Sequence, residues 1–199
     1  MYKRQLISDT FVPEYRVVER DRGGDEEKNG WEIHQNARYR MPLQALLGWD
    51  LAAPMIGIAQ GAIEEFTNRL IGTSGPGRTA ENDSVQVRLS QASAEVDAAR
   101  ALMRGDIQEM FLKAREGEVF SMLDRARYRR DKAFVAQQCM NAVNRLFEMS
   151  GGHAIFESGR MQRFHRDIQA AVHRDGFIME LGGLQYGRAA LGLEPKGRI

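Results

Sequence analysis

The chain has 199 residues, and its 28 basic and 27 acidic side chains leave a formal net charge of +1. This balance gives no reason to expect nucleic acid or an anionic membrane as the main partner, and no apolar run approaches the roughly 18–20 residues of a membrane span. The single cysteine, Cys139, excludes an internal disulfide framework and fits a reducing compartment, so we expect a cytoplasmic protein.

Residues 1–41 differ from the rest of the chain. The segments FVPEYRVV (11–18) and WEIHQNARYRM (31–41) are rich in β-branched and aromatic residues, and the charged segment 21–30 separates them. This pattern predicts two strands around an exposed loop. Because two strands are not stable alone, they must pack on the helices, on another chain or on further sequence.

The sequence from Pro42 onward predicts helices. Asp50 is placed as an N-cap, and Pro54 falls in the first turn, where a missing N–H is tolerated. Gly72 and the polar loop 73–82 end this first helix. Its apolar residues have the spacing of one helical face: Leu51, Met55, Ile58, Ala62, Phe66 and Leu70.

Two longer helices follow, and their apolar residues alternate spacings of four and three, as in a coiled-coil seam. The second helix begins near Asp83 or Ser84, and the third begins at Ser121, with Asp124 placed as in a capping box. The two seams consist of Val85, Leu89, Ala92, Val96, Ala99 and Met103, and of Met122, Ala126, Arg129, Ala133, Ala136, Met140, Val143 and Phe147.

A fourth helix is predicted over roughly residues 160–178, and a last short helix includes residues 184–193. Three helices of about 25 residues and a shorter fourth predict an antiparallel bundle. We therefore predict an all-α fold, a four-helix up-down bundle with a short N-terminal β appendage. The predicted boundary separates residues 1–41 from residues 42–199.

The third helix has apolar residues away from its main seam, namely Phe134, Val135, Cys139 and Leu146. A helix that is apolar on two sides needs two packing partners. This pattern predicts contacts between subunits in addition to the core of the bundle.

The most informative stretch is SGGHAIFESGRMQRFHRDIQAAVH, residues 150–173. Gly151 and Gly152 lead through a polar loop into the fourth helix, which carries Arg163 and Arg166. Glycines and arginines near a helix entrance suit a phosphate-bearing cofactor. His173, seven residues after Arg166, can act as an acid or base near neutral pH.

Each of these residues also has a purely structural interpretation. The two glycines can simply end the third helix. Arg163 and Arg166 can form ion pairs with Glu157 or Asp167, and His173 can be a histidine at a helix end. His34, His153 and His165 read as ordinary polar positions, and no cluster has the spacing of metal ligands, so we expect no metal site.

The order of these parts resembles the C-terminal half of the acyl-CoA dehydrogenase superfamily. The likeness is closer to its flavin-dependent monooxygenase branch, the oxygenase components of two-component aromatic hydroxylases. Four segments carry it: FVPEYRVV, APMIGIAQGAIEEF, the stretch 150–173 and YGRAALGLEP. Because a full chain of this family is about twice as long, the resemblance implies a C-terminal piece, with residues 1–41 the remnant of a middle β-domain and residues 42–199 the C-terminal bundle.

The resemblance also implies a reaction. The complete enzyme would take reduced flavin, FAD or FMN, from a separate flavin reductase and hydroxylate a small aromatic substrate with O₂. His173 would be catalytic, hydrogen-bonding a phenolic substrate or the flavin hydroperoxide. The family assembles as a homo-oligomer, a tetramer. The implied cofactor contacts are Gly151, Gly152, Phe156, Arg163 and Arg166.

Two alternatives stay open at this point. An acyl-CoA dehydrogenase would carry its base, a glutamate, seven residues before the arginine of the QR pair, but here that position is Phe156, and Glu157 lies six residues before Arg163. This offset favours the monooxygenase. The second alternative is a non-catalytic helical bundle that only oligomerises.

Overall fold

The structure, a computed structural model, describes residues 6–17, 31–72 and 79–196, and these residues contain helices and turns but no strand. The predicted all-α fold is confirmed. The helices are α1 (Trp31–His34), α2 (Leu43–Leu46), α3 (Trp49–Gly72), α4 (Asp83–Glu116), α5 (Met122–Met149), α6 (Arg160–Val172) and α7 (Met179–Ala190), with short 3-10 turns η1 (Glu14–Arg16), η2 (Ala37–Arg40), η3 (Thr79–Glu81), η4 (Gly152–Ile155) and η5 (Asp175–Phe177).

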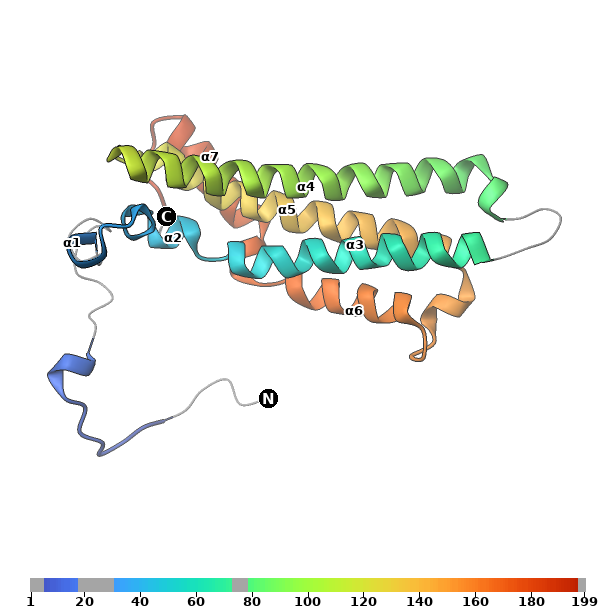
Figure 1. Ribbon diagram of the computed structural model, residues 1–199, viewed down its shortest axis with the longest axis horizontal. Helices are drawn as coiled ribbons and strands as arrows, with labels where there is room; N and C mark the ends of the chain where they lie inside the picture. Colours follow the sequence, from blue (N-terminus) through green and yellow to red (C-terminus); the bar gives the residue numbers. More distant parts are fainter. Residues whose placement is uncertain (1–5, 18–30, 73–78, 197–199) are drawn as a thin grey trace.

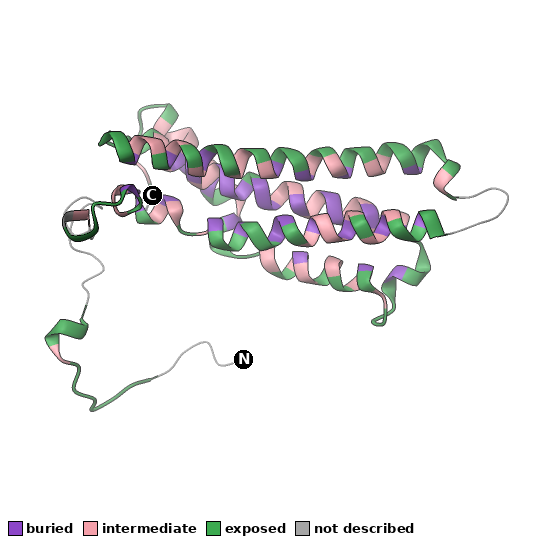
Figure 2. Cartoon of the chain, viewed as in Figure 1, coloured by how far each residue is buried: buried purple, intermediate pink, exposed green. Residues whose placement is uncertain are grey.

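Helices α3, α4, α5 and α6 run alternately up and down and form the bundle (Figure 1). The apolar faces of these helices point toward one another, and the outward faces are exposed (Figure 2). Helix α7 packs on one end of α5. At that same end lie α2, the start of α3 and the end of α6.

Helix α3 begins at Trp49, two residues earlier than a helix capped by Asp50 would. Instead, Asp50 Oδ1 accepts the N–H of Gly48 at 2.9 Å, and Gly48 has a φ of +103° that favours glycine. The predicted capping role of Asp50 is therefore wrong. Pro54 consequently lies beyond the first turn, and its missing N–H leaves one carbonyl without a partner in the helix.

The two long helices follow the sequence pattern closely. Asn82 caps α4, its side chain accepting the N–H of Ser84. Ser121 and Asp124 form the predicted capping box at the start of α5. Helix α4 extends well past the predicted seam because Met110 and Ala114 continue its buried face.

Helix α5 is the centre of the bundle, since it packs against α3, α4, α6 and α7. Val135, Cys139 and Leu146 are fully buried by these neighbours within the single chain, while Phe134 is 39% exposed. The second apolar side of α5 is thus explained by intrachain packing. Of the four residues predicted to mark a subunit contact, only Phe134 reaches the surface.

Two glycines allow helices to approach closely. A Cβ at Gly61 on α3 would lie 2.9 Å from the ring of Phe164 on α6. A Cβ at Gly182 on α7 would lie 3.0 Å from the backbone oxygen of Arg129 on α5. The first distance is shorter than Cβ contacts in proteins show and the second is tighter than most of them, so a side chain at either glycine would require a neighbour to shift.

The predicted β appendage is not confirmed. Within residues 31–41, the predicted second strand, the chain forms α1 and η2, which is a correction. Arg40 stacks on the ring of Trp31 at 3.7 Å, and the buried side chains of Ala37 and Met41 join the core of the bundle. Packing against α4 outweighs the local preference for extended structure.

The described part of the predicted first strand is also not a strand. Residues 6–17 leave the bundle as an irregular segment with the single turn η1 (Figure 1). Its apolar side chains are exposed, with Leu6, Phe11 and Tyr15 each more than 80% accessible. Residue 18 and the predicted loop 21–30 lie outside the described residues, and the predicted domain boundary at residue 41 stays a prediction.

By length and composition, the helical stretch Leu43–Gly72 is apolar enough to cross a membrane, contrary to the expectation from the sequence. Some of its apolar residues, such as Met55, Ala59 and Phe66, are buried in the bundle, whereas Leu43, Leu47 and Ile71 are exposed.

Candidate functional site

The residues that the sequence singled out lie on helix α6 or directly before and after it. Gly151 and Gly152 precede it in the turn from α5, and His173 follows its last residue, Val172. A helix of 13 residues spans about 20 Å. The two groups therefore lie at opposite ends of α6 (Figure 1).

The glycine end of α6 is an exposed turn. Gly151 has a φ of +69°, a conformation that favours glycine, whereas a Cβ at either Gly151 or Gly152 would meet nothing within 4 Å. Arg69 on α3 donates to the carbonyl of Ser150 at 3.0 Å and holds the turn against the bundle. Phe156, the aromatic residue predicted to contact the cofactor, is 57% exposed.

The two arginines predicted to hold a phosphate lie on the surface of α6. Arg163 and Arg166 both approach Asp167, at 3.5 and 3.6 Å. The predicted ion pairs with Asp167 are thus present. Because such exposed pairs contribute little to stability, either guanidinium can turn to a competing anion.

His173 is the C-cap of α6 and is exposed, so it lies at the helix end rather than inside a longer helix. Its Nδ1 is 2.6 Å from the carbonyl oxygen of Gln169. Since a carbonyl oxygen can only accept, Nδ1 carries a proton in this contact. In the neutral ring Nε2 is then the basic nitrogen, which is the state that a general base requires.

The other histidines described have structural roles. His165 stacks on Phe147 with ring centroids 4.0 Å apart, and burial lowers its pKa. His34 stacks on Tyr39 at 4.8 Å. Among the described residues, no group of three or more His, Cys, Asp or Glu side chains could hold a metal ion.

A pocket of about 300 Å³ lies at the His173 end of the bundle. Three segments far apart in the sequence form it: the corner between α2 and α3, the first half of α5 and the segment between α6 and α7. Its lining consists of Gln44, Leu47, Gly48, Asp50, Leu51, Arg125, Arg129, Lys132, Arg174, Gly176 and Phe177. Arg174, which lines the pocket, directly follows His173 in the sequence, while His173 itself is not among the lining residues.

Lys132 is the buried basic residue of this pocket, with an exposed fraction of 4%. Its Nζ donates to the carbonyls of Gln44, Ala45 and Leu47 at 3.1, 3.1 and 2.6 Å. These contacts satisfy the end of the short helix α2 and fix the corner from which α3 starts. Burial, with a contribution from the nearby Arg129, lowers the pKa of Lys132 to about 8.

Sequence reasoning missed this pocket although one signal was present. Arg125, Arg129 and Lys132 are spaced by four and three residues, so they share one face of α5. Arg129 stood out as the polar member of an apolar seam. That the opposite wall comes from the α2–α3 corner could not be read from spacing.

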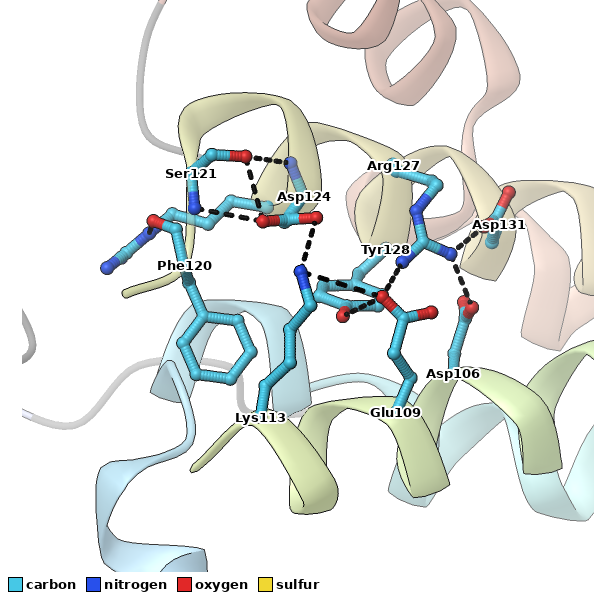
Figure 3. A network of polar contacts seen from close by, with 10 residues as sticks. Asp106, Glu109, Lys113, Phe120, Ser121, Asp124, Arg127, Tyr128 and Asp131 are labelled. Atoms are coloured by element: carbon cyan, nitrogen blue, oxygen red, sulfur yellow. Dashed lines mark hydrogen bonds and ion pairs between the residues drawn. The ribbon is translucent and has the colours of Figure 1, made fainter. Parts of the chain in front are cut away.

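A polar network joins α4 to α5 at the same end of the bundle (Figure 3). Arg127 donates to Asp106 at 3.1 Å and to Glu109 at 2.5 Å, and Tyr128 donates to Glu109 at 3.1 Å. Burial and the Asp131 carboxylate raise the pKa of Asp106 to about 7, against the opposing effect of Arg127. This network fixes the register of the two helices behind the pocket.

Glu157, whose position distinguished two branches of the superfamily, is exposed in the loop before α6. It therefore lies at the glycine end, away from His173 (Figure 1). A carboxylate and a histidine at opposite ends of a helix of 13 residues cannot act on the same bond within one chain.

Comparisons with known proteins place this geometry in a family. A model of the family "Acyl-CoA dehydrogenase, C-terminal domain" matches residues 50–175. The chain is 30% identical, over 98% of its length, to the FADH(2)-dependent resorcinol hydroxylase, oxygenase component, of Rhizobium sp. strain MTP-10005. It is 28% identical, over 94% of its length, to the flavin-dependent monooxygenase, oxygenase subunit HsaA, of Rhodococcus jostii strain RHA1.

The structural comparisons agree. The 3-HSA hydroxylase from Rhodococcus sp. RHA1 superposes with a TM-score of 0.88 at 26% identity, covering 96% of this chain and 50% of that one. Butyryl-CoA dehydrogenase from Megasphaera elsdenii superposes with a TM-score of 0.60 over 77% of this chain and 38% of its own, at 22% identity, which shows a shared fold alone.

The chain spans about half the length of the curated relatives it matches: 51% of the resorcinol hydroxylase component and 50% of the HsaA subunit. The matched relatives are oxygenase components of flavin-dependent monooxygenases, and the resemblance predicted from the sequence is confirmed. The chain belongs to the acyl-CoA dehydrogenase C-terminal domain family and corresponds to the C-terminal half of flavin-dependent monooxygenase oxygenase components.

Proposed function

We propose that the whole protein is the oxygenase component of a two-component monooxygenase that hydroxylates a small aromatic compound. The full-length match of this chain to half of a resorcinol hydroxylase component supports the reaction class. The observation that carries the proposal is the hydrogen bond from Nδ1 of His173 to the carbonyl of Gln169, which leaves Nε2 available as a base.

The proposed cofactor is a reduced flavin delivered by a separate flavin reductase, and it supplies the activation of O₂. The resorcinol hydroxylase relative is named as FADH(2)-dependent, so FAD is tested before FMN. The residues of this chain suit such a group as surface contacts. The exposed backbone at Gly151 and Gly152 lets a ligand approach closely, and Arg163 and Arg166 offer charge to phosphates.

The proposed role of His173 is to hold the substrate hydroxyl and accept its proton at Nε2. The hydrogen bond from Nδ1 to Gln169 keeps the ring in one tautomer and one orientation. A positioned base of this kind raises the electron density of a phenol ring at the moment of attack.

The proposed assembly is a homotetramer in a reducing cytoplasm. Because the glycine end and His173 lie about 20 Å apart along α6, one chain cannot offer both to the same end of a cofactor. Two chains packed side by side can combine the glycine end of one with the His173 end of the other.

The test is His173→Ala in the whole protein, assayed with reductase, flavin and O₂. We expect hydroxylation to fall by roughly 10²–10⁴-fold, the usual effect of losing an acid–base group. The control is His165→Phe, which keeps the stacking on Phe147 and removes an imidazole from the same helix. Equal losses in both variants, or no hydroxylation of any phenol by the unaltered protein, would contradict the proposal.

A further inference from the structure

Two carboxyl groups are buried next to each other in the network between α4 and α5. Asp106 on α4 and Asp131 on α5 are each 2% exposed. Nη1 of Arg127 lies 3.1 Å from Oδ1 of Asp106 and 3.8 Å from Oδ2 of Asp131, so one nitrogen reaches both groups (Figure 3). Two carboxylates that share a buried site repel each other, and this repulsion favours keeping one of them protonated.

The hydrogen bonds of these two groups differ between their oxygens. Oδ1 of Asp106 accepts from Arg127, and Oδ1 of Asp131 accepts from Nε of Arg130 at 2.7 Å. Within the described residues, no nitrogen or hydroxyl group donates a hydrogen bond to the buried Oδ2 of either group. Because a carboxylate oxygen only accepts, two ionised groups would leave both Oδ2 atoms unsatisfied. A single proton on one group satisfies both, since a protonated carboxyl group donates.

The charged groups that face the pair from α4 and α5 have other partners. Arg127 donates to Asp106 through one nitrogen and to Glu109 through another. Glu109 also accepts the hydroxyl of Tyr128, and Nζ of Lys113 lies 3.8 Å from it. The guanidinium of Arg127 is thus already divided between two carboxyl groups.

Two further cations near the pair are also bound elsewhere. Arg130 donates to Oδ1 of Asp131, and its guanidinium lies 4.1 Å from the centre of the Tyr186 ring on α7. Lys132, which follows Asp131, donates to three backbone carbonyls at the α2–α3 corner. The donor for the two Oδ2 atoms is therefore best supplied by one of the carboxyl groups themselves.

The titration of Asp106 agrees with this geometry. Burial, followed by the charge of Asp131 and a hydrogen bond to it, raises the pKa of Asp106 from 3.8 to about 7, although Arg127 opposes the shift. Asp106 is therefore the group that holds the proton below neutral pH, and Asp131 is the acceptor.

We propose that Asp106 and Asp131 share one proton, which joins α4 to α5 in acid and neutral solution and is released in mildly alkaline solution, where the two carboxylates repel each other. Arg130 extends this pH-sensitive contact to α7 through Tyr186. Lys132, the next residue after Asp131, lines the pocket, so release of the proton weakens contacts directly behind one pocket wall. The shared proton does not depend on the proposed hydroxylation.

The first test is carboxyl-carbon NMR of the 199-residue chain, isotope-labelled at its aspartates and titrated with base. The Asp106 carbon should shift with a midpoint near pH 7. The Asp131 carbon should shift by less over the same range, because it loses the hydrogen bond that it accepts. Asp124 is the internal control and should shift only in acid, since hydrogen bonds from Ser121 and Lys113 lower its pKa although burial opposes them.

Two variants separate the shared proton from a general effect of negative charge. Asp131→Asn and Glu109→Gln each remove a carboxylate near Arg127, but Asp131 is the proposed acceptor and Glu109 is not. Asp131→Asn should weaken proton binding by Asp106 about tenfold, whereas Glu109→Gln should weaken it less than about threefold. The wild-type titration needs no substitution, so it tests the shared proton even if Asp131→Asn does not fold.

Amide hydrogen exchange of α4 residues 106–116 measures the effect on the helix contact. The folded chain holds a proton with a midpoint near pH 7 that the unfolded chain does not hold, so stability falls as the pH rises through this value. Corrected for intrinsic exchange rates, protection in wild type should fall about tenfold between about pH 6 and pH 8. In Asp106→Asn it should stay nearly constant. Lys132, with a pKa of about 8, titrates in both proteins, so their difference reports on the pair.

Four outcomes would overturn the proposal. If Asp106 is already ionised in mildly acid solution, a water molecule or a cation joins the two groups instead of a proton. If the Asp131 carbon does not respond while Asp106 titrates, Asp106 is a buried acid without a shared proton. Equal weakening by Asp131→Asn and Glu109→Gln would leave only a general charge effect. Unchanged protection of α4 in wild type would show that the proton does not hold the two helices together.

Discussion

The two ends of α6 are built in different ways. At the His173 end, Lys132 makes three hydrogen bonds to the backbone at the α2–α3 corner, and Arg127 joins α4 to α5. At the glycine end, Gly151 and Gly152 form an exposed turn, where a Cβ at either position would meet nothing within 4 Å. The His173 end is therefore held by contacts within one chain, whereas the glycine end is an open surface turn.

Lys132→Met tests the His173 end and should have the largest effect. Removing the ammonium leaves three backbone carbonyls without their donor, and we expect a loss of about 2–4 kcal/mol in the free energy of unfolding. Urea denaturation measures it.

The control for this prediction is Lys113→Met. Lys113 is a half-buried lysine whose Nζ lies 3.0 Å from Asp124 and does not bind backbone carbonyls. It should lose less than half as much stability. Equal losses would mean that the contacts at the α2–α3 corner contribute no more than an ordinary ion pair.

Gly61→Ala tests how closely α6 packs on α3, the contact that holds both ends of α6 on the bundle. The added methyl group would lie 2.9 Å from the ring of Phe164, so we expect about 1–3 kcal/mol of destabilisation. Gly57→Ala lies on the same helix with nothing within 4 Å and should stabilise by up to about 1 kcal/mol. Thermal unfolding of the pair gives the sign, and two stabilised variants would show that α6 docks loosely.

Asp106→Asn tests the network behind the pocket. Because burial raises the pKa of Asp106 in the folded chain to about 7 from an ordinary 3.8, the folded state binds this proton more tightly than the unfolded state. This contribution to stability is complete below pH 4 and is lost as the pH rises to about 7. We expect the free energy of unfolding of Asp106→Asn to change less between pH 4 and 7 than that of wild type. At pH 8 the variant should be more stable than wild type by about 1 kcal/mol.

Asp124→Asn is the control for Asp106→Asn, because the pKa of Asp124 is lowered in the folded chain and that of Asp106 is raised. Although burial opposes it, hydrogen bonds from Ser121 and Lys113 hold the pKa of Asp124 below its ordinary value. Its contribution is present above pH 4 and is lost only in more acid solution, so Asp124→Asn should destabilise the chain without changing the slope between pH 4 and 7. If the free energy of unfolding changes with pH equally in Asp106→Asn and in wild type, Asp106 is not the cause of that pH dependence.

Gly151→Ala and Gly152→Ala test the exposed end and should have the smallest effects on stability. Gly151 has a φ of +69°, so we expect its substitution to destabilise by about 1 kcal/mol, while Gly152→Ala should be nearly neutral. A loss of flavin binding in Gly152→Ala, measured by absorbance titration of the whole protein, would then report on the ligand and not on folding. Equal destabilisation by both would show that the turn depends on both glycines.

Local sequence determined the long helices of this protein. The capping box of Ser121 and Asp124 and the seam from Val85 to Met103 act between residues three or four apart, so spacing alone predicts them. The resemblance likewise lies in short segments such as residues 150–173, which is why the family could be identified before the structure.

Tertiary packing decided those features that depend on contacts between segments far apart in the sequence. Residues 31–41 have the composition of a strand, but burial of Ala37 and Met41 beside α4 makes them helical. Likewise, the second apolar side of α5 is covered by four helices of the same chain. The pocket exists only because the α2–α3 corner, α5 and the segment after His173 meet in space, and no spacing along the chain encodes such a meeting, since each wall depends on the packing of the other two.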